Sequence, residues 1–146
     1  SAVAETVSYR AAQSNAPSGW PVDSRTVSTE FNPSADPSIS DGRKHYGMDI
    51  STQSRIIPIY ATASGTVVTA QYHSEFGNYV VIDHGNGFTT LYAHCTDLNV
   101  AVGDKVKKGD TIATTGSTGM STGVHCHYEI QLNGVYQNPR DYLGEE

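Results

Sequence analysis

The chain has 146 residues and a formal net charge of −6, with 37% hydrophobic and 16% charged residues. This length suits a single domain with its own core, which buries roughly two-thirds of the surface of the unfolded chain. No basic run offsets the acidic charge, so we expect no nucleic-acid binding and no attachment to an anionic membrane. Membrane insertion is not expected either, because no segment approaches the roughly 20 apolar residues of a membrane span.

The first 19 residues carry no hydrophobic period that would bury one face of a helix or strand. They also lack the cationic start and apolar centre of a signal peptide. We therefore expect residues 1–19 to be a poorly ordered linker or tether and residues 20–146 to form the domain. Because the sequence begins at Ser1, we expect it to be part of a longer protein. We also expect the domain to be monomeric.

From Trp20 onward, turn residues recur at short intervals between runs rich in β-branched and aromatic residues, such as 66–72, 79–83 and 88–94. The segment His84-Gly-Asn-Gly87 predicts an antiparallel hairpin, because Asn-Gly tolerates the positive φ angles of a type I′ turn. No stretch of ten or more residues has a helical period. The predicted fold class is therefore all-β, with antiparallel sheets and little helix.

Histidines concentrate in three short words, each with polar residues at alternate positions. The words are His45-Tyr-Gly-Met-Asp49, Thr90-Leu-Tyr-Ala-His94 and His125-Cys-His-Tyr-Glu129. Alternate residues of a strand share a face, so each word is expected to present its polar set on one side. A single histidine on a sheet is more often a hydrogen-bonded structural residue. Three words of the same parity instead indicate a metal pocket, because crowded titratable groups are costly without a metal.

Two histidines and one aspartate make the open three-ligand set of catalytic zinc, whose fourth position holds water. The same set also holds ferrous iron in oxygenases. We prefer zinc, because the additional histidines would supply the proton transfer and charge stabilisation that hydrolysis needs. Spacing alone does not decide whether His125 or His127 is the ligand.

The three words also resemble the signature of the M23 family of zinc metallopeptidases, the LytM and lysostaphin type that cuts peptidoglycan. The resemblance extends from about Trp20 to Leu143. Further similar segments are residues 27–31, 63–67, 77–84, 102–112, 116–119 and 138–143. The fold that this resemblance implies is a LytM-like domain of the duplicated hybrid motif type.

The resemblance also implies a role for each residue of the three words. His45, Asp49 and His127 would bind one Zn²⁺ per chain, while His94 and His125 would act beside it as catalytic residues. The implied activity is endopeptidase hydrolysis of peptidoglycan stem peptides or cross-bridges. It implies an extracellular or cell-wall location, for a secreted enzyme or for a phage lysin or virion-associated protein.

Four further residues are predicted around the site. We assign Asn32, Tyr92 and His73 to the substrate groove, from the long loop 31–44, the strand of His94 and the loop 73–77. The alternatives are a core position for Tyr92, which its pattern also fits, and a solvent-facing position for His73. Glu129 is predicted to orient an imidazole from outside the metal's ligand set, with a hydrogen bond at the end of its strand as the alternative. His84, beside the hairpin, is expected to be structural.

Cys95 and Cys126 stand where members of the family usually carry apolar residues. Strand parity places both sulfur atoms on the side away from the metal. We interpret them as small buried hydrophobic residues, with a disulfide or zinc ligation as the alternatives.

Two other functions remain open. One is a catalytically inactive relative that acts through partner contacts, against which the complete set of histidines argues. The other is a carrier domain, because residues 102–110 also resemble half of a biotinyl or lipoyl domain. A carrier needs a lysine at an exposed hairpin tip, and that interpretation explains no histidine. The sequence does not decide between a D-amino-acid cross-link and a glycyl bridge as the bond that is cut.

Overall fold

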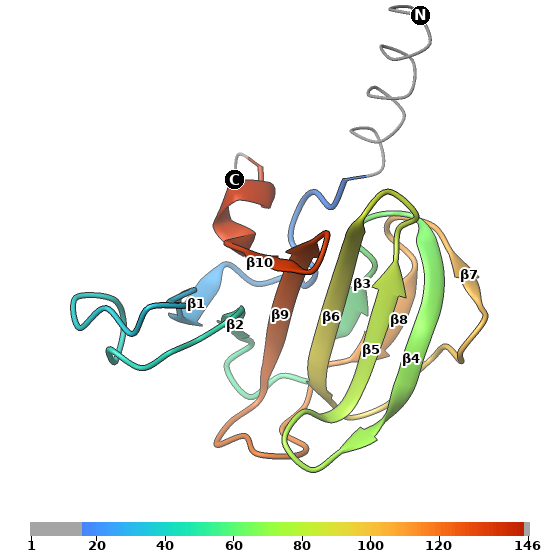
Figure 1. Ribbon diagram of the computed structural model, residues 1–146. Helices are drawn as coiled ribbons and strands as arrows, with labels where there is room; N and C mark the ends of the chain where they lie inside the picture. Colours follow the sequence, from blue (N-terminus) through green and yellow to red (C-terminus); the bar gives the residue numbers. More distant parts are fainter. Residues whose placement is uncertain (1–15, 145–146) are drawn as a thin grey trace, which may run out of the picture.

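A computed structural model describes residues 16–144, and a large antiparallel sheet dominates it (Figure 1). The strands are β1 (Thr26–Thr29), β2 (Met48–Ser51), β4 (Gly65–His73), β5 (Gly77–Asp83), β6 (Phe88–Cys95), β7 (Lys105–Val106), β9 (His125–Leu132) and β10 (Val135–Gln137). Their order in the sheet is β1-β2-β9-β6-β5-β4-β7, and β10 pairs with the end of β9, beyond the residues that pair with β2.

A second sheet, formed by β3 (Pro58–Tyr60) and β8 (Thr111–Thr114), lies behind the large sheet in Figure 1. The hydrophobic core joins the two sheets: Ile59 and Ile112 belong to the same buried cluster as Met48, Ile50 and Tyr128. The predicted all-β class is confirmed. Within residues 16–144 the only helix is the 3-10 helix η1 (Pro139–Tyr142), and no apolar helix of membrane-spanning length occurs there.

The hairpin predicted around residues 84–87 is present between β5 and β6, closed by a hydrogen bond from His84 N to Phe88 O. The predicted turn type is wrong, because the positive φ angles fall on Gly85 and Gly87 and not on Asn86. The connection is a four-residue loop in which two glycines take the left-handed conformations.

Residues 1–15 of the predicted linker lie outside the described residues. Its last residues are in contact with the domain, where Ser18 N donates to Thr62 O and Gly19 N donates to Tyr142 O. The division of the chain at residue 19 stays a prediction.

The pairing of β2 with β9 brings the first and third histidine words together. Asp49 lies opposite His127 in this pair, and Ile50 lies opposite Cys126. Met48, Ile50, Cys126 and Tyr128 all face the core. Strand alternation therefore places Asp49 and His127 on the other face of the sheet, away from β3 and β8.

Candidate active site

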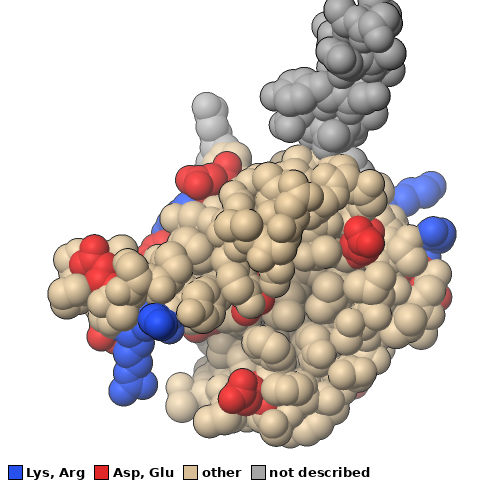
Figure 2. All heavy atoms as spheres, viewed as in Figure 1, with Lys and Arg blue, Asp and Glu red and all other residues tan. Residues whose placement is uncertain are grey.

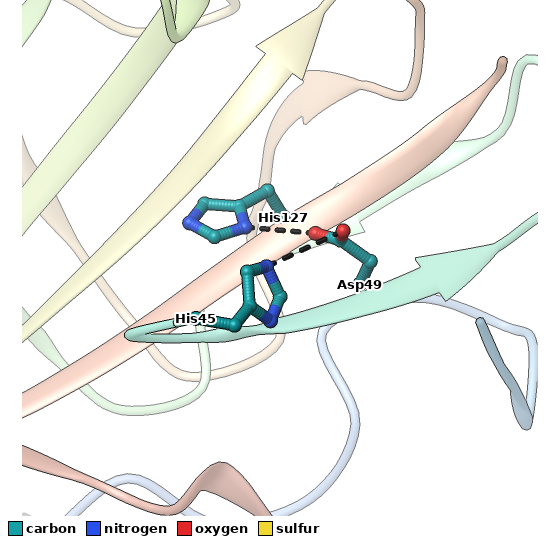
Figure 3. Close-up of side chains that lie close together, drawn as sticks. All are labelled: His45, Asp49 and His127. Carbon is teal, nitrogen blue, oxygen red and sulfur yellow. Dashed lines mark hydrogen bonds and ion pairs between the residues drawn. The ribbon is translucent and has the colours of Figure 1, made fainter. Parts of the chain in front are cut away.

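Three side chains converge on that outer face: His45, Asp49 and His127 (Figure 3). His45 Nε2 lies 3.4 Å from Asp49 Oδ2, and His127 Nδ1 lies 2.8 Å from Asp49 Oδ1. One ligand atom from each residue fits within 4.8 Å of the others, and this is the group in the described chain suited to hold a metal ion. A tetrahedral zinc spaces its ligand atoms roughly 3.3 Å apart, so these residues fit zinc with small adjustments.

Gly47 allows residues 45–49 to pack closely against β9. A Cβ atom at this position would lie 2.5 Å from the backbone oxygen of Tyr128 and 2.8 Å from Cγ of Glu129. Only a residue without a side chain lets His45 and Asp49 lie directly over His127.

We expect Gly47→Ala to weaken zinc binding and to lower the free energy of unfolding by about 1–3 kcal/mol, because the added methyl group forces β2 and β9 apart. Zinc titration and denaturant unfolding measure the two effects. Gly123→Ala is the matched control, because a Cβ atom there meets no atom within 4 Å. Equal zinc affinity and stability in the two variants would contradict the close-approach explanation.

Each imidazole of the site has one ring nitrogen occupied by an acceptor on the side away from Asp49. Nδ1 of His45, His94 and His125 donates to the backbone oxygens of Glu30, Thr118 and Gly123 at 3.0, 2.7 and 2.8 Å. Nε2 of His127 lies 2.8 Å from Glu129 Oε2. A carbonyl oxygen can only accept, so the three backbone contacts fix the tautomers of His45, His94 and His125 and leave Nε2 of each for the pocket.

Glu129 therefore occupies the position that its predicted orienting role requires. It is buried and contacts the nitrogen of His127 that does not face Asp49. A carboxylate behind a metal-binding histidine holds the ring and makes the ligand nitrogen more basic.

We expect Glu129→Gln to reduce zinc affinity by about 10- to 100-fold, because a neutral amide polarises His127 less. Competition with a chelating dye measures this. Glu30→Gln is the control, because Glu30 supports His45 through its backbone oxygen while its carboxylate pairs with Arg140. An equal loss of zinc affinity in both variants would mean that the removed negative charge causes the effect, and not the contact of Glu129 with His127.

The pocket groups shift one another's protonation. Burial raises the pKa of Asp49, but hydrogen bonds from three surrounding histidines outweigh it and hold that pKa well below its usual range. Burial lowers the pKa of His127, whereas hydrogen bonds to Asp49 and Glu129 raise it to about 9. Metal binding at Nδ1 of His127 must therefore displace a proton. Burial also lowers the pKa of His94, which favours a neutral ring there.

His94 reaches the pocket through a β-bulge in β6. Tyr92 pairs with Val80 and Cys95 with Asn78, so β6 carries one more residue here than β5. The extra residue is His94, whose φ is +62°. The left-handed conformation costs about 1–3 kcal/mol. It turns the ring of His94 to the outer face, whereas regular alternation would have placed that ring in the core.

The expectation that Thr90 and Tyr92 share a face with His94 is wrong, because the bulge turns His94 to the other side of the sheet. Tyr92 is fully buried among core residues, where its hydroxyl contacts Thr62 and Thr90. It does not line the groove, because it lies on the opposite side of the sheet.

The other two predicted groove residues also have different surroundings. Asn32 is 1% exposed, and its amide bonds to the backbone of Asp36 while its main chain pairs with His45. It holds the loop and the backbone of His45. His73 is exposed outside the pocket, where its ring packs on Phe76 and its Nδ1 accepts from Glu75 N. Both support segments that border the site, and neither lines it.

Cys95 and Cys126 are free, fully buried thiols of the core, as interpreted from the sequence. The two cysteines form no disulfide, and burial raises the pKa of Cys95 to about 12, which favours the protonated thiol. His84 is buried against Ser64 O and Thr90 Oγ1, in agreement with a structural role.

His94 and His125 lie side by side, with ring centroids 4.8 Å apart, next to the three clustered residues. All five line one pocket of about 380 Å³. Its remaining walls come from two loops, with Glu75 and Phe76 on one side and Met120, Ser121 and Thr122 on the other. A second, more polar hollow continues from Asp49 and His125 along Ser28, Thr29 and Ser51. Together they form a groove with the clustered residues at its centre.

The sequence interpretation missed these wall residues. The glycines that punctuate residues 74–77 and 116–123 were the available signal, because glycine-rich loops between strands often border sites. A hydrogen bond from Met120 N to Glu75 O joins the two loops across the pocket wall.

Comparison with known proteins identifies similar domains. The sequence profile of Peptidase family M23 matches residues 43–139. "Peptidoglycan DD-endopeptidase ShyC" of Vibrio cholerae serotype O1 is 41% identical over 82% of this chain. A zinc containing peptidase from Vibrio cholerae superposes with a TM-score of 0.75 and 31% identity, covering 90% of this chain and 40% of that one. The catalytic domain of lysostaphin from Staphylococcus simulans superposes with a TM-score of 0.66 and 31% sequence identity, covering 81% of this chain and 90% of that one. The chain spans 28% of ShyC and less than a third of the other most similar curated relatives.

Proposed function

The chain belongs to peptidase family M23, and from that membership we propose that it is a zinc-dependent endopeptidase that hydrolyses peptide bonds of peptidoglycan. The observation that carries the proposal is the orientation of the imidazoles. Four rings present a nitrogen to one pocket, while backbone oxygens and Glu129 occupy their other nitrogens. A site built only for stability would leave no such set directed at solvent.

We assign His45, Asp49 and His127 as the zinc ligands. When bound there, zinc would lower the pKa of a coordinated water to about 7 and polarise the scissile carbonyl. The residues of this chain do the rest: Glu30 O and Glu129 orient two ligands, and Asp49 offsets the charge of the metal.

His94 is the proposed base, and His125 is the proposed hydrogen-bond donor to the oxyanion. Both lie outside the ligand group but line the same pocket, with Nε2 unoccupied by a backbone acceptor. A neutral His94 can take a proton from the attacking water, and His125, whose pKa Asp49 raises against the effect of burial, can hydrogen-bond the developing oxyanion.

The D,D cross-link between stem peptides is the proposed bond. ShyC, named a DD-endopeptidase, is 41% identical over 82% of this chain, whereas the lysostaphin domain is 31% identical over 81%. Such a substrate places the protein outside the cytoplasmic membrane. The short coverage of ShyC supports the view that this domain belongs to a longer protein.

One digestion tests the proposal. Zinc-loaded protein is incubated with two purified cell walls, one cross-linked directly by D,D bonds and one through glycyl bridges, and new termini are identified by mass spectrometry. We expect new termini from the D,D-linked wall, lost on chelation and restored by zinc. Cleavage of the glycyl wall alone would overturn the bond assignment. No cleavage of either wall by protein with one bound zinc would overturn the enzymatic proposal.

A further inference from the structure

Glu75 is an acidic side chain at the pocket wall with no partner within the described residues. It lines the same pocket as His45, Asp49 and His127. Its carboxylate makes no hydrogen bond or ion pair there, whereas Asp49 in the pocket and Glu129 behind it are both bonded to His127.

The backbone of Glu75 is held on both sides. Its N–H donates to His73 Nδ1 at 3.1 Å, and its carbonyl accepts from Met120 N at 2.9 Å. The strand β5 begins two residues later at Gly77, whose surroundings leave no room for a Cβ atom. The main chain of Glu75 is therefore fixed at the pocket wall, from which the exposed side chain extends.

Next to this carboxylate the pocket wall is apolar. Phe76 packs on His127 with ring centroids 6.1 Å apart, and Met120, 74% exposed, stands across from it. A methylene chain that ends in an ammonium group matches such a wall, because the stem packs on the apolar surface while the charge reaches the acid. The Phe76 ring adds attraction for a cation near its face.

The charge of the groove favours the same ligand. No Lys or Arg lines either hollow within the described chain. On the pocket face, the one turned away from β3 and β8, Lys and Arg lie at the margins and leave the centre free (Figure 2). Asp49 and Glu129 balance the charge of a bound Zn²⁺, so Glu75 is left as the uncompensated acid.

We propose that Glu75 binds the side-chain ammonium group of the substrate, and that the preferred substrate carries a free amine close to the cleaved bond, on a residue other than the one whose amine forms that bond. This inference rests on the proposed peptidoglycan endopeptidase function. It names the substrate class as stem peptides whose diamino acid keeps an unacylated amine. Acylation of that amine removes the charge that Glu75 recognises.

Two cross-linked peptides test the inference, one with the free amine and one with the same amine acetylated. For the free amine we expect Glu75→Gln to lower kcat/KM about fivefold, mostly through KM, because a partly exposed ion pair is lost. For the acetylated peptide the variant and the parent protein should be equal. High salt should remove the preference for the free amine in the parent protein. The control Asp83→Asn removes one charge at the far end of β5 and should change nothing.

Equal losses with both peptides, or no loss with either, would overturn the role of Glu75. Calorimetric titration with the two peptides is run in parallel, because binding does not require turnover. If the parent protein cleaves neither peptide, the proposed function fails, and the affinities still decide on Glu75. Tighter binding of the free amine, lost in Glu75→Gln, supports the inference, and equal affinities reject it.

Discussion

Asp49→Ala should abolish both zinc binding and peptide hydrolysis. Asp49 lies between His45 and His127, at 3.4 and 2.8 Å, and it supplies the only carboxylate of the ligand group. Without it the two imidazoles lose the charge that holds them together around a cation. We expect a loss of zinc affinity larger than the roughly 10- to 100-fold typical of removing a residue that merely orients a ligand. Zinc content after gel filtration and the rate of peptide cleavage measure the two effects.

A thermal unfolding series separates lost binding from lost folding. Zinc should raise the Tm of the parent protein and leave that of Asp49→Ala unchanged, because a ligand stabilises only the state that binds it. Asp83→Asn, which retains its acceptor for Gly85 N, should respond to zinc like the parent protein. An Asp49→Ala protein with one bound zinc would contradict the ligand assignment.

Substitution of His94 should differ from Asp49→Ala in zinc binding alone: zinc is retained, while turnover is lost. The His94 ring centroid lies 6.0 Å from that of His127, and His94 is outside the group suited to hold a metal. Loss of a proton-transfer group slows a reaction by about 10²- to 10⁴-fold. We expect that decrease in kcat for both His94→Ala and His94→Asn.

The two His94 variants separate chemistry from backbone strain. Asparagine tolerates the left-handed conformation that His94 adopts at φ +62°, whereas alanine does not tolerate it as well. His94→Asn should therefore be the more stable variant by up to about 1 kcal/mol, with equally low kcat. Denaturant unfolding and zinc analysis check both statements. Loss of zinc from His94→Asn would contradict the proposed division between ligand and catalytic residue.

Strand alternation predicted the face on which each side chain lies correctly where strands were regular. Alternation in β9 sets His127 and Glu129 against Cys126 and Tyr128, and the structure preserves that division. It failed at β6, because an inserted residue reverses the parity of everything beyond it. Tyr92 was placed in the groove for that reason, although it lies in the core.

Loops were the other source of error. Asn32 and His73 lie close to the site in sequence and in space, yet their polar atoms form hydrogen bonds with neighbouring backbone groups. A sequence gives the identity of a loop residue but not the direction of its side chain, since that direction depends on which carbonyls and amides the loop leaves unpaired.

The sequence by itself determined the all-β class, the scarcity of helix and the three histidine words, because turn residues and strand alternation are local properties of the chain. Only the tertiary structure decided which atoms meet. The register of β2 on β9 sets Asp49 against His127, the absence of a side chain at Gly47 lets the strands touch, and the bulge turns His94 outward. These depend on contacts between segments up to about 80 residues apart, as in the 78-residue separation of Asp49 and His127, which no local pattern encodes.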